Sequence, residues 1–573
     1  MSTVVIPELR PGQTVRPEIR GRRGVISAGK SFAVAAGMRV FARGGNAIDA
    51  GIAAVLAAAV TEISHFGFGG ECPVAIHEGR SGRSYVIPGL GPAPMLATPG
   101  VFAPQGFIDF NGPRACTVPA VVDSVCSALG ASGSLSLGDV IEPAIELARG
   151  FPVYETLHRH LVDERAACIR FPSTAAAYYP NGDPTPVGSL FRQPDLAATF
   201  SALVDAESAA RRAGLDRRAA LSAVRDAFYL GDIGATIAAA VEREGGLLRR
   251  EDLVRFRGRA ELPVVGRYRG ATILKGGFWC QGPALLLALG ILDGIDLPSM
   301  GAGSADAIHF AVEALKLALD DRDAHFGDPD HVTIPHDTLL SDAYHAARRS
   351  LIDANAAALE HRPGLGAEMP RTGGSWLGSG DTTAVSAADA DGNLFCAVPS
   401  SGWLLGGAFI AAGTGIPMGN RMQSFVLDPR RPNCLAPGKR PRMTLTPTLV
   451  LLDGKPWLAI GTPGGDSQEQ QILQVLSGLL DHRLPLQRAI EAPRFNSEHA
   501  QSSFAFHTDQ PGVLSVETTL AEGTRRELAR RGHRLREVGA FGMATGMTAA
   551  GIERSGTLRA GADPRGERYA LGD

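Results

Sequence analysis

A stretch without hydrophobic periodicity divides this 573-residue chain into two parts with different patterns. Residues 361–380 read HRPGLGAEMPRTGGSWLGSG, which is a turn and linker composition and predicts an exposed segment. Before it, the pattern is mainly helical to about residue 355, with short strands expected at Cys72–His77 and Ser84–Ile87 and a strand-like stretch at Leu262–Leu274. After it, paired strands dominate. The length allows two or more domains or one large layered fold.

Two β-hairpins are predicted after the linker, because apolar runs flank an Asp-Gly turn in each case. The runs are Thr383–Ala388 with Leu394–Val398, and Thr446–Leu452 with Trp457–Gly461. Both hairpins would contribute antiparallel strands to a mixed fold of helices and sheets.

Three helix starts are also predicted. Asn46 is expected to cap a small-residue helix that begins at Ala47, and Thr518 to cap a helix that runs to Arg531. Gly464-Gly465-Asp466 is expected to open a helix over Ser467–Asp481.

Composition and charge narrow the class of protein. Lys plus Arg number 56 and Asp plus Glu 59, which leaves a net charge of −3 and no long block of one sign. No nucleic-acid partner is therefore expected.

The cysteines and the apolar runs indicate the compartment. The seven cysteines are scattered without a CxxC pair, a pattern that indicates buried reduced thiols. The first 24 residues show no secretory signal, and the longest apolar run, Ala50–Val60, is too short to cross a bilayer, so we expect a cytoplasmic protein with no membrane partner.

One motif suggests nucleotide binding. Gly24–Ser31, GVISAGKS, matches the phosphate-loop pattern G-x-x-x-x-G-K-[ST]. A phosphate loop needs a buried strand directly before its first glycine, so that the loop amides point at the phosphates. Residues 16–23 are too charged and too broken by proline for such a strand, and we set nucleotide binding aside.

A second set of residues suggests a metal site. It consists of Asp321, Asp323, His325, Asp328 and His331. Gly327 and Pro329 between them favour a loop with solvated charges, and no metal is expected there.

The predicted chemistry centres on Thr382. Gly380-Asp381-Thr382-Thr383 joins the linker to the first hairpin strand, where a threonine hydroxyl could attack the carbonyl of the preceding residue. Hydrolysis of the resulting ester would leave Thr382 at a new N-terminus. Its α-amine, with a reference pKa near 7.7 to 8.0, can take the proton of the hydroxyl beside it. Thr382 would then be nucleophile and base together; the plain alternative is a threonine that begins a strand.

Acyl transfer also needs donors for the negative oxygen of its transition state. Gly464 and Gly465 offer unhindered amides at the positive end of the predicted helix, although they could equally be turn glycines. Ser400 and Ser401, at the end of the second hairpin strand, could hydrogen-bond the Thr382 hydroxyl.

Together these residues resemble the γ-glutamyltransferase family of N-terminal nucleophile hydrolases. The likeness runs from about Gly24 to Val538 through several ordered motifs. They are Gly44–Ala50, Asp381-Thr382-Thr383, Gly413–Ile416, Pro437–Pro441, Thr446-Pro447-Thr448, Gly461–Gly465 and Ala492–Phe495. We identify the chain as a divergent member.

The resemblance implies an α+β fold, a four-layer αββα sandwich of the N-terminal nucleophile hydrolase type. It also implies self-cleavage into a large chain, residues 1–381, and a small chain, residues 382–573, which stay associated. By the family pattern Thr382 is the nucleophile, Ser400 supports it, and Gly464 with Gly465 form the oxyanion hole. Neither a metal nor an organic cofactor is implied, and a homodimer is left open.

The substrate-recognition residues depart from the family pattern. Relatives that act on γ-glutamyl compounds hold the glutamyl carboxylate with an arginine and two serines, where this chain has residues near Leu90 and Met443-Thr444. They hold the glutamyl amine with Asn, Gln or Glu, and Asp, where this chain has Gly402, Arg421 and Ser424.

An arginine at position 421 would repel a cation, and its planar guanidinium can bind a carboxylate through two charge-assisted bonds. We therefore predict Arg421, Ser401 and Thr444 as substrate-binding residues; the alternative is that Arg421 points outward from a loop.

These observations predict a self-processing amidohydrolase or acyltransferase for a small amide that is not a γ-glutamyl compound. Three alternatives remain. The chain could be a γ-glutamyl hydrolase or transpeptidase with a rearranged pocket, a biosynthetic member that cleaves another bond, or a non-catalytic scaffold homologue. Retention of Thr382, Ser400 and the glycine pair argues against the last.

Overall fold

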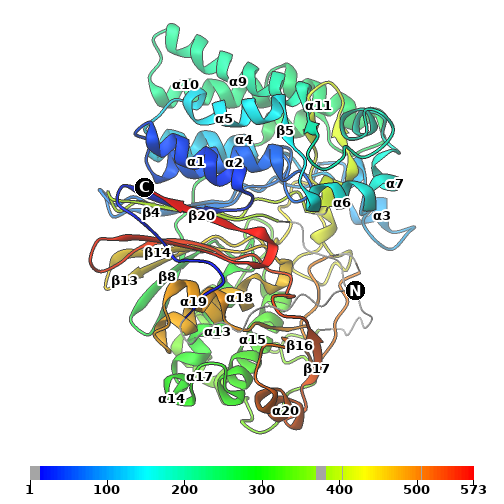
Figure 1. Cartoon of the computed structure of the whole chain (residues 1–573). Coiled ribbons are helices and arrows are strands. Elements are labelled where there is room, and N and C mark those ends of the chain that lie inside the picture. The colour runs from blue at the N-terminus through cyan, green and yellow to red at the C-terminus, as the bar shows by residue number, and fades with distance from the viewer. Residues whose placement is uncertain (1–12, 370–381, 403, 505) are drawn as a thin grey trace.

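The computed structural model describes residues 13–369, 382–402, 404–504 and 506–573. Figure 1 shows two β-sheets lying face to face near the middle of the molecule, with helices above and below them. The predicted linker at residues 361–380 is described only to residue 369, and the Asp381 side of the predicted cleavage bond lies outside the described residues.

The first sheet has seven antiparallel strands. In spatial order they are β1 (Ile19–Gly21), β19 (Leu558–Ala562), β18 (Thr548–Ile552), β14 (Lys455–Gly461), β13 (Thr448–Leu452), β8 (Ala271–Lys275) and β7 (Val264–Tyr268). The pair β13–β14 confirms the second predicted hairpin. The stretch Leu262–Leu274 forms two strands rather than one, because Arg269 and Gly270 both adopt positive φ and turn the chain back.

The second sheet has six antiparallel strands. In spatial order they are β20 (Tyr569–Gly572), β2 (Gly24–Ala28), β9 (Val385–Asp389), β10 (Leu394–Ala397), β3 (Val74–His77) and β4 (Ser84–Ile87). The pair β9–β10 confirms the first predicted hairpin. Strand β2 runs through the GVISAGKS motif and is entirely buried, so its first five residues are a sheet strand and not a phosphate loop.

Each sheet mixes strands from before and after residue 381. The six-stranded sheet places β9 and β10 between β2 and β3, and the seven-stranded sheet places β13 and β14 beside β8. The sheets pack on each other mainly through β18 with β9 and β19 with β2 and β20, around a core of small apolar side chains. The two predicted chains therefore share one core, in the four-layer αββα arrangement that the resemblance implied.

Two helices rich in small residues, α1 (Ser31–Ala42) and α2 (Ala47–Thr61), cover the six-stranded sheet. The Asn46 side chain accepts hydrogen bonds from two backbone amides and caps α2, as predicted. Every residue of α2 is buried. Gly51 allows its close approach to the sheet, since a Cβ there would lie 2.3 Å from the Phe395 ring.

The seven-stranded sheet is covered by helices α13 (Gly282–Asp293), α18 (Gln468–Leu480) and α19 (Leu486–Glu491). Helix α15 (Ala305–His325) packs on the outside of α13. The helix predicted from Ser467 begins one residue later, after a 3-10 turn over Gly465–Ser467.

The expectation of solvated charges at Asp321 and Asp323 is wrong. Both lie on α15 and are buried. Asp321 pairs with Arg348 at 3.2 Å, and Asp323 pairs with Arg322 at 2.9 Å and with Arg442 at 2.6 Å. The arginines replace water as partners of the carboxylates.

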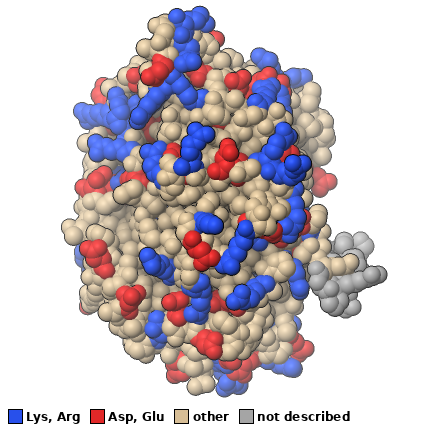
Figure 2. Space-filling view, turned by 90° about the vertical axis from the view of Figure 1, so that its left-hand side faces the viewer, with Lys and Arg blue, Asp and Glu red and all other residues tan. Residues whose placement is uncertain are grey.

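The remaining helices lie mostly above the six-stranded sheet in Figure 1. They include α4 (Val121–Ser132), α5 (Leu137–Arg149), α6 (Glu155–Asp163), α9 (Pro194–Arg212), α10 (Arg217–Tyr229), α11 (Asp232–Arg243) and α12 (Arg250–Arg255). Within the described ranges, every helix is too short or too polar to cross a membrane. Figure 2 shows basic and acidic side chains interspersed over the face that it presents, as the balanced composition suggests.

A small sheet of β15 (Phe495–Ser497), β16 (Val513–Glu517) and β17 (Arg534–Val538) lies beside helix α20 (Glu522–Arg530). The prediction that Thr518 caps this helix is wrong. The Thr518 amide instead donates to the Val538 carbonyl at 2.9 Å and continues the sheet. The seven cysteines are buried free thiols, as predicted.

Candidate functional site

Thr382 lies directly before strand β9 and is buried, with 4% of its surface exposed. The β9–β10 register pairs Val385 with Ala397, and the Thr383 amide donates to the Pro399 carbonyl at 3.0 Å. The same register, continued by one residue, places Thr382 opposite Ser400. Such opposed side chains point to one face of the sheet and have Cβ atoms roughly 4.5–5.5 Å apart. The structure thus brings the predicted nucleophile and its predicted supporting hydroxyl together.

Ser400 is held by two donors. Its Oγ accepts a hydrogen bond from Arg421 Nη2 at 2.8 Å and another from the Gly402 amide at 3.0 Å. A serine hydroxyl has two lone pairs and one proton, so these bonds occupy both lone pairs. The hydroxyl can therefore donate only its single proton, and the neighbouring guanidinium strengthens it as a donor. This is the role expected of a hydroxyl that stabilises charge on a neighbouring threonine oxygen.

Arg421 is almost fully buried, so the alternative of an outward-pointing side chain is wrong. Its Nε and Nη2 both donate to Glu71 Oε2 at 3.1 Å. Burial raises the pKa of Glu71, and the adjacent guanidinium opposes that rise. Among the described residues, Arg421 Nη1 has no hydrogen-bond partner.

The glycine loop, which we define as Gly464-Gly465-Asp466, follows β14. Gly464 has a φ of +124° and Gly465 a φ of +57°, a pair of conformations that favours glycine. The Gly464 carbonyl accepts from the Ser467 amide and hydroxyl, at 3.1 and 2.8 Å. Because a trans peptide directs its N–H opposite to its C=O, the Gly465 amide points away from the helix. No acceptor for the Gly464 or Gly465 amide is found in the described part of the chain, as an oxyanion hole requires.

The junction and the glycine loop lie at one end of the two facing sheets. A Cβ on Gly461, the last residue of β14, would lie 3.5 Å from the Ala384 Cβ, just after Thr382-Thr383. Phe504 connects the glycine loop to Arg421. A Cβ on Gly465 would lie 2.9 Å from its ring, and the Arg421 guanidinium carbon lies 5.9 Å from the ring centre.

Thr444 and Ser401 differ in their position relative to this site. The Gln281 side chain donates to both the Thr444 carbonyl, at 3.2 Å, and the Gly465 carbonyl, at 2.9 Å, so Thr444 lies beside the glycine loop. Its buried hydroxyl has no partner among the described residues. The Ser401 hydroxyl accepts from the Gly67 amide at 2.7 Å and thus has a structural partner already.

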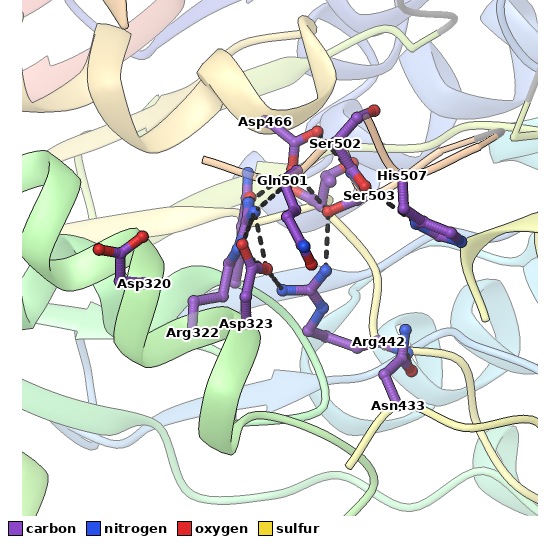
Figure 3. Close-up of polar contacts among 12 residues, drawn as sticks. Asp320, Arg322, Asp323, Asn433, Arg442, Asp466, Gln501, Ser502, Ser503 and His507 are labelled. Atoms are coloured by element: carbon purple, nitrogen blue, oxygen red, sulfur yellow. Dashed lines mark hydrogen bonds and ion pairs between the residues drawn. The ribbon is translucent and has the colours of Figure 1, made fainter. Parts of the chain in front are cut away.

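A largely buried charge network, which we call the α15 network, contacts the glycine loop through Asp466, whose side chain is 23% exposed (Figure 3). It consists of Arg322, Asp323, Arg442 and Asp466. Arg322 Nη1 contacts Asp466 at 2.5 Å, and Asp466 accepts from the Ser503 amide at 2.8 Å. Burial favours the neutral form of Asp323, but the two arginines outweigh it and lower the Asp323 pKa to about 2. The network fixes the loop through a residue of the loop itself.

Sequence reasoning missed Glu71, the partner of Arg421, and Arg568, whose Nη1 donates to Thr383 Oγ1 at 3.0 Å. The only local signal for Glu71 is its place between two glycines and a buried cysteine. Leu90, near which the family pattern suggests an arginine, lines a separate cavity of about 800 Å³ that contains none of the predicted site residues. A smaller cavity of about 130 Å³ opens on Gly464, Gly465 and Phe504.

Comparisons with known proteins agree with this geometry. The family model described as gamma-glutamyltranspeptidase matches residues 33–572. The chain is 33% identical over 570 residues to the acylase ACY 1 proenzyme of Pseudomonas sp. (strain SE83), covering 97% of this chain and 94% of the relative. It is 31% identical over 555 residues to the glutathione hydrolase-like YwrD proenzyme of Bacillus subtilis (strain 168), covering 96% and 99%.

The solved structure of a cephalosporin acylase from Bacillus halodurans matches the fold with a TM-score of 0.86 at 27% identity, over 99% of each chain. The family model and the sequence relatives span nearly the whole chain, and the four-layer architecture is shared. The chain is therefore an N-terminal nucleophile amide hydrolase that belongs to the gamma-glutamyltranspeptidase family.

Proposed function

We propose that Thr382 is the nucleophile and that the chain cleaves itself between Asp381 and Thr382. The observation that carries the proposal is the strand register that sets Thr382 opposite Ser400. The proenzyme names of both sequence relatives support self-processing. Residues 1–381 and 382–573 would remain associated, because their strands alternate within both sheets.

Self-cleavage proceeds in two steps. The Thr382 Oγ attacks the Asp381 carbonyl carbon, an ester forms, and the Thr382 nitrogen leaves as an amine that carries the hydroxyl proton. Water then hydrolyses the ester, which releases the Asp381 carboxylate and restores the Thr382 hydroxyl. The new α-amine now lies next to that hydroxyl.

Turnover repeats this chemistry on an external amide. The α-amine of Thr382 takes the Oγ proton as Oγ attacks the substrate carbonyl, and the amides of Gly464 and Gly465 bind the developing oxyanion. The ammonium returns its proton to the departing amine of the substrate. Water, or an acceptor amine, then removes the acyl group from Thr382.

The preferred substrate is proposed to carry a carboxylate or a neutral group in place of the glutamyl amino acid head. Arg421 Nη1 and the Thr444 hydroxyl are both buried and unpartnered among the described residues, so they can receive a carboxylate oxygen and a polar group. An ammonium group at this position would be repelled by the positively charged Arg421 guanidinium. The acylase names of two relatives support an acyl amide outside the γ-glutamyl class.

A γ-glutamyl hydrolase with a rearranged pocket is the second candidate. The 31% identity to a glutathione hydrolase-like proenzyme favours it. Among the described residues, the Glu71 carboxylate, which lies against Arg421, is a group near Ser400 that could attract an ammonium in this case.

Maturation is tested on purified protein by denaturing gel and N-terminal sequencing. The wild-type chain should separate into fragments of about 40 and 20 kDa, in proportion to its 60.0 kDa, with Thr382 at the new terminus. Thr382→Ala should stay in one piece, and Thr382→Ser, which keeps a hydroxyl, should cleave. Cleavage of the alanine variant, or a terminus elsewhere, would contradict the proposal.

Specificity is tested with anilides that carry glutaryl, acetyl and γ-glutamyl groups. The wild type should prefer the glutaryl compound, and Arg421→Met combined with Glu71→Gln should lose that preference. Glu71→Gln is included because Arg421→Met alone would leave the buried Glu71 carboxylate without its ion-pair partner. Since Ser400 also loses a donor, the measured quantity is the ratio of glutaryl to acetyl rates. Rapid hydrolysis of the γ-glutamyl anilide by the wild type would favour the second candidate.

A further inference from the structure

Arg568 contacts both threonines of the cleavage junction. It lies directly before β20, with a side chain that is 3% exposed. Its Nη1 donates to Thr383 Oγ1 at 3.0 Å, and its Nη2 contacts the Thr382 carbonyl oxygen at 3.5 Å. One guanidinium therefore touches the main chain of Thr382 and the side chain of its neighbour.

Arg568 is fixed by Glu62, the residue that directly follows α2. Glu62 is completely buried, and its Oε2 accepts from Arg568 Nη1 at 3.3 Å. Its other oxygen accepts from the Lys30 amide at 3.0 Å. Both carboxylate oxygens are thus engaged, one by the main chain of the GVISAGKS motif and one by Arg568.

Glycines make room for both groups. A Cβ on Gly29 would lie 2.0 Å from Glu62 Oε1, and a Cβ on Gly546 would lie 2.4 Å from Arg568 Nε. The backbone at these two positions therefore packs directly on the ion pair. This contact explains the Gly29-Lys30 part of the phosphate-loop pattern without a nucleotide, because the glycine admits the Glu62 carboxylate and the lysine amide binds it.

We propose that Arg568, held by Glu62, is a positioning residue that fixes Thr382 for attack on the preceding carbonyl and, after cleavage, on the substrate. The inference rests on the proposed role of Thr382 as nucleophile. Reacting groups must be held close to their productive geometry, and small displacements lower rates severely. The planar fork of an arginine directs its donors at a carboxylate, a hydroxyl and a carbonyl in fixed directions, whereas the ammonium of a lysine is a compact point charge on a flexible stem.

The first test separates positioning from stability by a double-mutant cycle. Arg568→Met alone leaves Glu62 buried and unpaired, so it should lower both the melting temperature and the rate of self-cleavage. In Arg568→Met with Glu62→Gln, the unpaired charge is gone and the melting temperature should recover. Self-cleavage should stay slow, by about tenfold or more, because the guanidinium that contacts Thr382 and Thr383 is missing. Arg568→Lys keeps the charge and should give an intermediate rate.

The second test is the pH profile of kcat/KM on a small anilide. Within the described part of the chain, the charged and titratable groups around the junction include Arg568, Glu62, Lys30, Glu567 and His65 on one side. The pair Arg421–Glu71 lies beyond Ser400. Burial holds the pKa of His65 well below its usual range, so that group stays neutral. Arg568→Met leaves a net negative charge by the α-amine and should move the acid limb to higher pH, whereas Glu62→Gln should move it to lower pH.

The matched control is the pair Arg225–Asp123, which is also largely buried, at 2.6 Å, but joins α10 to α4. Arg225→Met with Asp123→Asn should leave self-cleavage at the wild-type rate. If the Arg568/Glu62 double variant also cleaves at that rate, or if the two single variants shift the pH limb in the same direction, the positioning role is overturned. Cleavage of Thr382→Ala would instead overturn the role of Thr382 itself, so the two failures are distinguishable.

Discussion

The two segments that meet at the candidate site are both fixed by buried arginines, but by different means. At the cleavage junction, Arg568 contacts Thr382 and Thr383 directly. At the glycine loop, Arg322 acts through the Asp466 side chain and shares Asp323 with Arg442. One segment is held by a single guanidinium, and the other belongs to a network of four charges.

The difference follows from what each segment must do. The junction contains the bond that is proposed to break, and its contacts to Arg568 lie on the side of that bond that keeps Thr382. They can therefore persist through maturation. The glycine loop must keep two amides pointed at an oxyanion that exists only briefly, and a rigid, fully paired network is suited to such preorganisation.

The largest effect is expected from breaking the α15 network. Arg322→Met would leave the buried Asp323 with Arg442 alone and would remove the arginine that pairs with Asp466. Breaking a buried ion pair in this way typically costs about 3–5 kcal/mol. The free energy of unfolding, measured by urea denaturation, should fall by that amount. A loss under about 1 kcal/mol would mean that the network does not hold the loop.

The next effect concerns the amides themselves. Gly465→Val would place a branched side chain against Phe504 at a φ of +57° and displace the loop. Loss of one oxyanion donor lowers turnover by about 10² to 10³. Gly454→Val is the matched control, because Gly454 has a φ of +74° in open space at the β13–β14 turn. If Gly465→Val kept full activity on the true substrate, the two glycines would form only a structural turn and would not bind the oxyanion.

The third effect is a pH dependence of the stability of the folded protein. It arises at His361, which contacts helix α15 and not the described residues of the cleavage junction. His361 lies between Asp320 of α15 and Asp509, at 2.8 Å from each, and these carboxylates raise its pKa to about 9 against the opposing effect of burial. The folded pKa exceeds the unfolded value of about 6.5, so the stabilisation is complete below about pH 6.5 and is lost as pH rises through about 9.

The loss should approach about 3 kcal/mol in denaturation experiments between pH 6 and pH 10. His361→Gln should remove this slope and leave the rate of self-cleavage per folded molecule unchanged, because the junction is held by other groups. If the free energy of unfolding fell with pH in the variant as it does in the wild type, another titratable group would be responsible for the pH dependence.

The smallest effect is expected for an exposed ion pair, which serves as the reference for the buried pairs discussed above. Arg526 and Glu522 form an exposed pair one turn apart on α20, with about three quarters of each side chain in solvent. Arg526→Ala should change the free energy of unfolding by no more than about 0.5 kcal/mol. A larger change would indicate that surface charges contribute more in this protein than the comparison assumes.

Much of the fold could be predicted because its signals are local. Apolar runs around Asp-Gly turns gave both central hairpins correctly, and Asn46 was recognised as a cap from its immediate neighbours. The Thr518 prediction failed because a tertiary contact, its bond to Val538, drew that residue into a sheet. Local preference decides an element only where no distant partner competes for the same backbone.

The candidate site divides in the same way. The motifs around Thr382, Ser400 and Gly464-Gly465 are each short and contiguous, so the sequence indicated the chemistry without any structure. The surroundings of Arg421 could not be read in this way, since its partner Glu71 lies 350 residues away. Whether Arg421 binds the substrate stays a prediction.

The sequence by itself determined the hairpins, the order of the family motifs and the junction at which Thr382 enters a strand, because these depend on neighbours within a few residues. Only the tertiary structure decided which charges are buried and which groups they contact. Arg568 and Glu62 are 506 residues apart and meet because β20 and the end of α2 belong to adjacent layers. A buried charge requires a partner, since an unpaired charge in the core would cost too much free energy. Which residue becomes that partner depends on how the helical layer packs on the sheet.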